Sequence, residues 1–240
     1  MTSFQARFRD KIGQLFGKEL SVDEVRDLSP HFRRVRISAP WLRTAAVSAG
    51  DKLQIMIAEC GPRTYSPFGH DSAAGALELL AYVHGETSTA TWVRALVPGA
   101  RFHAMGPRGS LALSSLPGPV VLFGDETSFG VATALRQARG SSNGLSFVFE
   151  CSHADEARTV LADIGLDGCS VVERQSARAH ARAVEGQLRA ALAQHPSAHL
   201  VLTGHAQMIQ ALRAALKAEP AAYAGQKVKA YWADGKRGLD

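Results

Sequence analysis

The first half of the chain is patterned like a set of short β-strands. Hydrophobic and polar positions alternate, or nearly alternate, over residues 32–37 and 52–57, which is typical of strands with one buried face. A denser apolar run at 77–83 and the segment 101–105, which follows a Pro-Gly turn, predict two further strands. Short strands separated by turns favour a small antiparallel β-barrel.

The pattern changes after Leu116, where a Pro-Gly-Pro segment precedes alternating strands and helices. The expected strands are 120–123, 146–149, 169–172 and 199–202. The helix after the first strand ends at 135, and the helices after the other three cover 155–161, 181–192 and 206–216. Such alternation predicts an α/β domain with a parallel sheet covered on both faces, whose ligands bind beyond the carboxyl ends of the strands. We therefore expect two domains, residues 1–116 and 117–240.

The first residues have the spacing of a basic amphipathic helix, with an apolar face formed by Phe4, Phe8, Ile12, Leu15 and Phe16. Such a helix either packs on the barrel, which we favour, or lies on a membrane surface. No apolar run approaches the roughly 20 residues that span a bilayer, and no secretory signal is apparent. We expect a cytoplasmic monomer without stable membrane insertion.

The composition is that of a globular protein, with 240 residues, 46% hydrophobic and 20% charged. Lys and Arg number 27 against 22 Asp and Glu, a net charge of +5, which favours anionic partners without choosing among them. Nucleic acid is disfavoured because no element interleaves basic and stacking residues. The three cysteines have no zinc or disulfide spacing, and Pro196 opposes a helical His195/His199 pair, so we expect no metal site.

The first candidate for chemistry is the tetrapeptide Arg63-Thr64-Tyr65-Ser66. It combines a guanidinium suited to phosphate, an aromatic face suited to a flat ring, and a hydroxyl. Arg63 and Tyr65 would share one face of an extended segment. The alternative is a solvated strand edge with one buried ring.

A second candidate is the start of a helix rich in small hydroxyl residues. It comprises His84, Thr87, Ser88, Thr89, Ala90, Thr91 and Trp92. Free amides at a helix N-terminus attract anions, whereas plain capping by Ser88 or Thr89 would need no ligand. A turn, Gly106-Pro107-Arg108-Gly109, is then expected to end the barrel half.

In this order, these motifs resemble the siderophore-interacting proteins, which are flavin-dependent ferric-siderophore reductases related to ferredoxin–NADP reductases. The resemblance includes Gly124-Asp125-Glu126-Thr127 after a strand and the closing Tyr231-Trp232 segment. It runs from about residue 32 to the end. It implies a six-stranded antiparallel flavin-binding barrel followed by an NAD(P)-binding α/β domain.

The resemblance also implies roles for individual residues. Arg63 would bind the flavin phosphate, with Thr64 beside it, Tyr65 would lie near the ribityl chain and ring, and Ser66 would lie near flavin N5. The amides of 87–91 would cradle a diphosphate. Gly124, Asp125, Glu126, Thr127 and Gly204 would border the nicotinamide nucleotide, and Trp232 would lie near both rings.

Three departures from the family pattern concern Phe68, the segment 87–90 and Ala233. Phe68 stands where a second Arg is common, Thr-Ser-Thr-Ala replaces Gly-Pro-Ala-Ser, and Ala233 replaces an Arg. These departures bear on which flavin is bound and on the identity of the electron acceptor. We favour FAD over FMN. Basic residues Lys227, Lys229, Lys236 and Arg237 would steer an acidic chelate or keep the tail soluble.

The expected function is NAD(P)H-dependent reduction of ferric-siderophore iron, or of another ferric chelate, which weakens the chelate and releases ferrous iron. Catalytic roles would fall to Tyr65, Ser66 and Trp232. Arg174, just after a strand, either pairs with the 2′-phosphate of NADPH or is solvated, and Cys151 is expected to be a small buried residue. The alternatives are a flavin or quinone reductase and a non-catalytic flavin-binding electron-transfer protein.

Overall fold

The computed structural model describes residues 17–58, 60–140 and 144–236. The chain divides into two compact units, Met1–Ala112 and Leu113–Asp240, each of which is described by itself. The expected helix over residues 4–16 and the basic residue Arg237 lie outside the described residues. None of the helices in the described ranges has the length and apolarity needed to cross a membrane.

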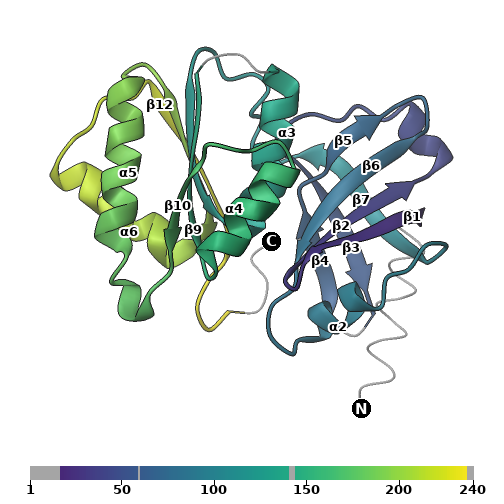
Figure 1. Cartoon of the computed structure of the whole chain (residues 1–240). Helices are drawn as coiled ribbons and strands as arrows, with labels where there is room; N and C mark the ends of the chain where they lie inside the picture. The colour runs from purple at the N-terminus through teal and green to yellow at the C-terminus, as the bar shows by residue number, and fades with distance from the viewer. Residues whose placement is uncertain (1–16, 59, 141–143, 237–240) are drawn as a thin grey trace. The chain divides into compact units, whose positions relative to one another are not determined.

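Unit 1 is an antiparallel sheet of seven strands in the order β4-β3-β7-β1-β2-β6-β5 (Figure 1). The strands are β1 Lys18–Ser29, β2 Phe32–Ser38, β3 Asp51–Ile57, β4 Gly61–Tyr65, β5 Phe68–Asp71, β6 Ala76–Tyr82 and β7 Arg101–Gly109, with the 3₁₀ helix η1 Pro40–Arg43 and the helix α2 Ser88–Arg94. The antiparallel β fold is as predicted, with seven strands in place of six.

Alternation builds the core of unit 1. In β2 Val35 and Ile37 are buried on one face and Phe32 on the other. In β3 Leu53, Ile55 and Ile57 are buried and pack in one core cluster with Val35 and Ile37, so alternate residues of both strands point inward. Burial of these branched and aromatic side chains, at about 1.5–3 kcal/mol each, is what makes the sheet stable.

The expected turn at 106–109 is instead part of strand β7. Arg108 and Gly109 pair with Lys52 and Asp51 of β3, and the register shifts between Lys52 and Gln54. A Cβ on Gly106, whose φ is +107°, would lie 2.6 Å from the carbonyl oxygen of Lys52. Only glycine accommodates this close approach, so the glycine allows a bulge within the strand and does not end it.

Unit 2 is a parallel sheet of five strands in the order β10-β9-β8-β11-β12. The strands are β8 Val120–Asp125, β9 Leu145–Cys151, β10 Ser170–Glu173, β11 His199–His205 and β12 Gly225–Trp232; the helices are η2 Glu126–Ser128, α3 Phe129–Arg139, α4 Ala154–Asp163, η3 Ser176–Arg178, α5 Ala181–Gln194 and α6 Ala206–Ala218. The parallel α/β fold predicted from the sequence is confirmed, and β12 extends the sheet by one strand.

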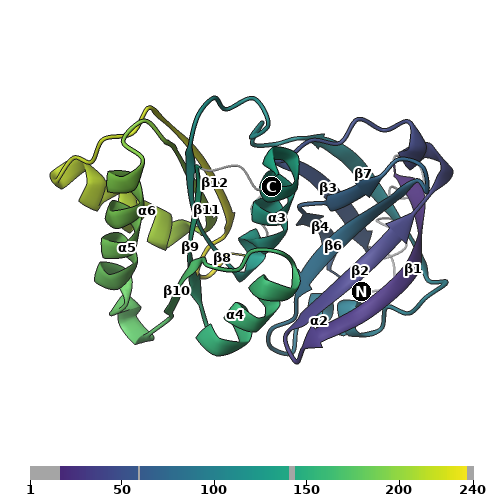
Figure 2. The same ribbon diagram turned by 45° about the horizontal axis from the view of Figure 1, so that its top comes forward.

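Helices cover both faces of this sheet. Figures 1 and 2 show α5 and α6 on one face and α3 and α4 on the other. Leu188 of α5 and Leu212 of α6 pack with Phe123 of β8, while Phe129 of α3 meets Phe149 of β9 edge to face at 4.8 Å between ring centroids. Because helices shield both faces of the sheet from water, the strands are continuous apolar runs, and the polar side chains lie at the strand ends.

Candidate functional site

Arg63 links strand β4 to the start of α2. Its Nε donates to Thr89 Oγ1 at 2.8 Å, and its Nη1 donates to the carbonyls of Cys60 at 2.9 Å and Pro62 at 2.8 Å. Among the described residues its Nη2 has no hydrogen-bond partner. Arg63 and Thr89, which are 26 positions apart, therefore belong to one polar group.

The start of α2 offers fewer amides than the sequence suggests. Thr87 caps the helix by accepting from the Ala90 amide at 3.1 Å, and the Thr91 amide donates to the Thr87 carbonyl at 2.9 Å. The helix is therefore capped, but by Thr87 and not by Ser88 or Thr89 as expected, and the amides of Ala90 and Thr91 are already used. In a helix of seven residues the dipole is small, so a phosphate here would depend on Arg63 and the Thr89 hydroxyl.

The aromatic residues of this region turn inward. Tyr65 and Trp92 pack against the hydrophobic core of unit 1, and Trp92 meets Phe102 edge to face at 5.5 Å. Burial raises the pKa of Tyr65 to about 12, although the Arg63 guanidinium acts against the rise. Tyr65 therefore keeps its proton at neutral pH and can only donate or accept as a neutral phenol.

The other expected residues of unit 1 lie around this group. Thr64 is exposed on the face of β4 opposite Arg63, and Ser66 is half-buried directly after the strand. His84 is exposed and stacks on Tyr82, with ring centroids 5.2 Å apart. The alternation predicted for 63–65 is observed.

The polar residues of unit 2 gather at the carboxyl ends of its strands. The strand order reverses between β8 and β11, which is where ligands bind in open parallel sheets. At this edge lie the expected residues Asp125, Glu126, Thr127, Arg174, Gly204 and Trp232, together with Glu150, His180, His205 and Asp234, which sequence reasoning missed.

Asp125 is the centre of the cluster at the end of β8. One carboxylate oxygen accepts from the Trp232 indole Nε1 at 2.6 Å, and the other accepts from the Thr127 amide at 2.9 Å and from the Thr127 hydroxyl. Burial and the neighbouring Glu126 raise the pKa of Asp125 to about 6, against the hydrogen bonds from Thr127 and Trp232. The carboxylate is therefore titratable close to physiological pH.

Two glycines make room for this arrangement. A Cβ on Gly204, whose φ is +93°, would lie 2.5 Å from Asp125 Oδ2. A Cβ on Gly124 would collide with the Ser128 side chain and lie 2.9 Å from Thr203 Oγ1. Both glycines allow the close packing of protein side chains at this edge.

Glu126 and Arg174 form a nearly buried ion pair. Arg174 Nη2 donates to Glu126 Oε2 at 2.9 Å and Nη1 to Oε1 at 3.3 Å, with side-chain exposures of 23% and 4%. Glu126 also accepts from the Ser152 amide at 2.6 Å. Hydrogen bonds and the Glu126 charge raise the pKa of Arg174 despite its burial, so the guanidinium stays charged.

Trp232 is positioned by three groups from three strand ends. Its ring stacks on His205 at 4.1 Å and 15°, its indole N–H is bonded to Asp125, and the Arg174 guanidinium carbon lies 5.9 Å from its centroid. The half-buried ring presents a flat surface for a second aromatic group.

A buried acid–imidazole pair lies behind this site. His180 Nε2 lies 2.7 Å from Glu150 Oε2, and the Gln175 amide donates to His180 Nδ1 at 3.0 Å. The Nδ1 is therefore an acceptor, and Nε2 donates to Glu150. The signal that could have revealed this pair is the single charged residue in the apolar strand 147–151.

Cys151 is fully buried, as expected. Burial and the carboxylates of Glu126 and Asp125 raise its pKa far above the usual thiol range. It is therefore an unreactive thiol in the folded protein.

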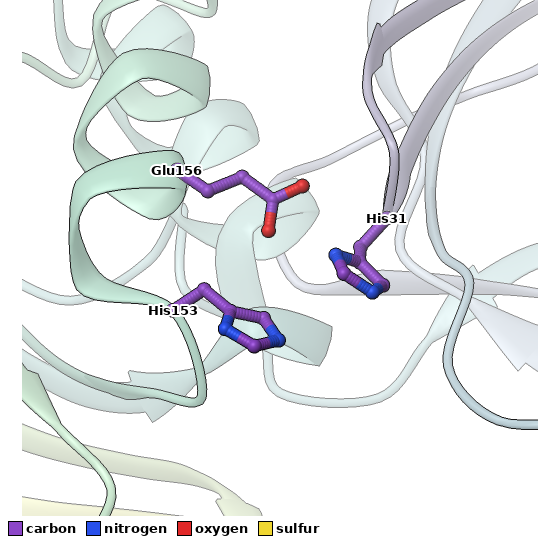
Figure 3. A group of neighbouring side chains, drawn as sticks. All are labelled: His31, His153 and Glu156. Carbon is purple, nitrogen blue, oxygen red and sulfur yellow. The ribbon is translucent and has the colours of Figure 1, made fainter.

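His153 and Glu156 lie at the start of α4, and Figure 3 draws them together with His31 from the turn between β1 and β2. His31 belongs to the other unit, so we assign no site to the three residues.

No family model matches the sequence, and the sequence matches no curated protein. Among solved structures, the fold is similar to that of a siderophore utilization protein from T. fusca (TM-score 0.70, 22% identity, covering 93% of this chain and 95% of that chain). It is also similar to the siderophore-interacting protein SipS from Aeromonas hydrophila (0.70, 16%, 92% and 93%).

A ferredoxin–NADP⁺ reductase from Plasmodium falciparum has the same fold (TM-score 0.62, 11% identity, covering 89% of this chain and 95% of that chain). The ferredoxin–NADP reductase-like fold expected from the sequence is thereby confirmed, and the resemblance to siderophore-interacting proteins extends to three dimensions. At these identities the similarity shows the fold, and function is argued from the site.

Proposed function

We propose that this chain is an NAD(P)H-dependent flavoprotein reductase whose acceptor is ferric iron held by a siderophore or another ferric chelate. The observation that carries the proposal is the pairing of Arg63 with the start of α2 in a chain that also places Asp125 and Trp232 at the switch point of a parallel sheet. The similarity in fold to siderophore-interacting proteins and ferredoxin–NADP reductases supports it.

The residues of unit 1 fit the phosphate-bearing part of a flavin. Arg63 Nη2 is unused within the described residues, and the Thr89 hydroxyl beside it can donate or accept. A planar guanidinium with a hydroxyl neighbour is a donor set suited to phosphate. We propose FAD as the flavin, with FMN less favoured, and assign the phosphate contact to Arg63.

When bound, the flavin would accept a hydride from the nicotinamide and pass electrons singly to ferric iron. The chain's own residues bind and orient. Tyr65 stays protonated and can donate to an oxygen, and Ser66 supplies a hydroxyl after β4. Trp232, fixed by Asp125 and His205, offers an aromatic face to the nicotinamide. Iron is substrate, so no protein ligand to iron is required.

Flavin binding by wild type, Arg63→Ala and Arg101→Ala tests the site. Loss of a charge-assisted phosphate contact should weaken flavin binding by about 1.5–3 kcal/mol, measured by titration of the apoprotein. Arg101→Ala is the matched control, because Arg101 is an exposed arginine of unit 1 that pairs with Glu19 and lies outside the proposed site. Equal affinities for all three proteins would show that Arg63 does not contact the flavin.

The acceptor is tested by anaerobic turnover with NAD(P)H. The proposal expects faster reduction of ferric siderophores than of quinones or free flavin. The reverse order would identify a flavin or quinone reductase. A protein that binds flavin but oxidises no NAD(P)H with any acceptor would be a non-catalytic electron-transfer protein.

A further inference from the structure

We infer that the nicotinamide nucleotide of this protein is NADH, because Arg174 is committed to Glu126 and is not available to a 2′-phosphate. The inference rests on the proposed function and names the substrate of that same site. A 2′-phosphate is a dianion that is generally recognised by an arginine near the strand ends of a nucleotide-binding sheet. Arg174, directly after β10, is the guanidinium that the sequence offers for that role.

The donors of Arg174 are directed into the protein. Besides its two bonds to Glu126, Nη1 donates to Ser152 Oγ at 2.7 Å and Nη2 reaches the Glu150 carbonyl at 3.4 Å. Its own backbone amide is bonded to the Cys151 carbonyl at 2.7 Å. Its Nε has no hydrogen-bond partner among the described residues but is buried, and Nη2 lies 3.9 Å from Glu150 Oε1. A phosphate could therefore reach the guanidinium only by displacing these contacts.

Displacement is opposed by the burial of Glu126. Its side chain is 4% exposed, and its other hydrogen bond comes from the Ser152 amide. Removing the guanidinium would leave a carboxylate in a low-dielectric environment without its counter-charge, which is strongly unfavourable. We therefore expect Arg174 to be more stable when it is paired with Glu126 than when it is paired with an incoming phosphate.

The surrounding charge also disfavours a dianion. The carboxylates at this edge are Asp125, Glu126, Glu150, Glu173 and Asp234. Against these five carboxylates stand the guanidiniums of Arg174 and Arg178 and the ammonium of Lys236, two residues after Asp234, and Arg178 lies 3.7 Å from Asp234. A ribose 2′-hydroxyl, in contrast, is neutral and can donate to a carboxylate such as the exposed Glu173.

The test compares binding of two fragments that differ only in the 2′-phosphate, adenosine 5′-monophosphate and adenosine 2′,5′-bisphosphate, by calorimetry on the full chain. Wild type should bind the monophosphate at least about tenfold more tightly, and NADH more tightly than NADPH. Glu126→Gln removes the carboxylate that is bonded to Arg174 and leaves Glu150, 3.9 Å away, as its nearest counter-charge, so the preference should shift at least about tenfold toward the bisphosphate. Glu185→Gln, which releases Arg189 on α5, is the matched control and should leave the ratio unchanged.

The double variant Glu126→Gln/Arg174→Gln replaces the buried pair by neutral residues and guards against misfolding of the single variant, with circular dichroism as the check. It should keep the wild-type preference for the monophosphate. Wild type that binds the bisphosphate more tightly than the monophosphate would overturn the inference. So would a loss of bisphosphate binding, with monophosphate binding unchanged, in the double variant or in Arg178→Ala. If neither fragment nor either dinucleotide binds, the proposed function fails together with the inference, so the two failures are distinguishable.

Discussion

Replacing Asp125 by Asn removes a fully buried carboxylate from the end of β8. Its pKa is raised from 3.8 to about 6 by burial and by Glu126. The folded state therefore binds more protons than the unfolded chain between about pH 4 and pH 6, and the free energy of unfolding falls as pH rises through this window. A shift of about two pKa units corresponds to about 3 kcal/mol above pH 6.

Asparagine should relieve part of that cost. Its carbonyl can still accept from the Trp232 indole, and its amide nitrogen can donate to the Thr127 hydroxyl, which now donates to Asp125. The Thr127 amide, which now donates to the carboxylate, then loses its acceptor. We expect Asp125→Asn to be about 1–3 kcal/mol more stable than wild type at pH 8, and the difference to disappear near pH 4.

The measurement is urea unfolding of both proteins at several pH values from 4 to 8, monitored by circular dichroism. Asp167→Asn, which removes an exposed carboxylate from the loop before β10, is the control and should change stability by less than about 0.5 kcal/mol. An Asp125→Asn protein that is no more stable than wild type at pH 8 would refute the reasoning. So would a gain in stability that does not shrink on acidification.

Three further outcomes are expected. Gly204→Ala should lower the free energy of unfolding by at least about 2 kcal/mol, because its Cβ would crowd Asp125 at a positive φ; a thermal melt equal to wild type would contradict this. Trp232→Phe keeps the stack on His205 but loses the bond to Asp125, so the stability-versus-pH curve should shift to higher pH, whereas an unchanged curve would remove Trp232 from the pKa argument. A thiol reagent at pH 8 should modify Cys60 before Cys151, which is fully buried; rapid labelling of Cys151 in folded protein would be the contrary result.

The fold was predictable where burial is one-sided or complete. The runs at 120–123 and 199–202 are continuous apolar strands because helices cover both faces of the sheet. Strand β1 was missed because only Leu20 and Val22 of its twelve residues are buried. Strand β12 was missed because it is an edge strand with lysines at alternate positions, and pairing with β11, not its own pattern, makes it a strand.

The candidate site was predictable where a local motif carries it. The sequence pointed to Arg63 and to the helix that begins at Ser88 as candidates, although the hydrogen bond between Arg63 and Thr89 depends on the sheet that joins them. The bond between Trp232 and Asp125 spans 107 positions, and no local pattern predicts its partner. The ion pair between Arg174 and Glu126 could not be predicted either, because the sequence shows only an arginine and the packing of the folded chain is what brings Glu126 next to it.

The central claim is that the chain binds a flavin, and the absorption spectrum of the purified full-length protein tests it most directly. The account predicts a yellow protein, or a colourless one that becomes yellow on incubation with FAD, with the released flavin identified as FAD by chromatography. A protein that remains colourless after incubation with either FAD or FMN would contradict the account.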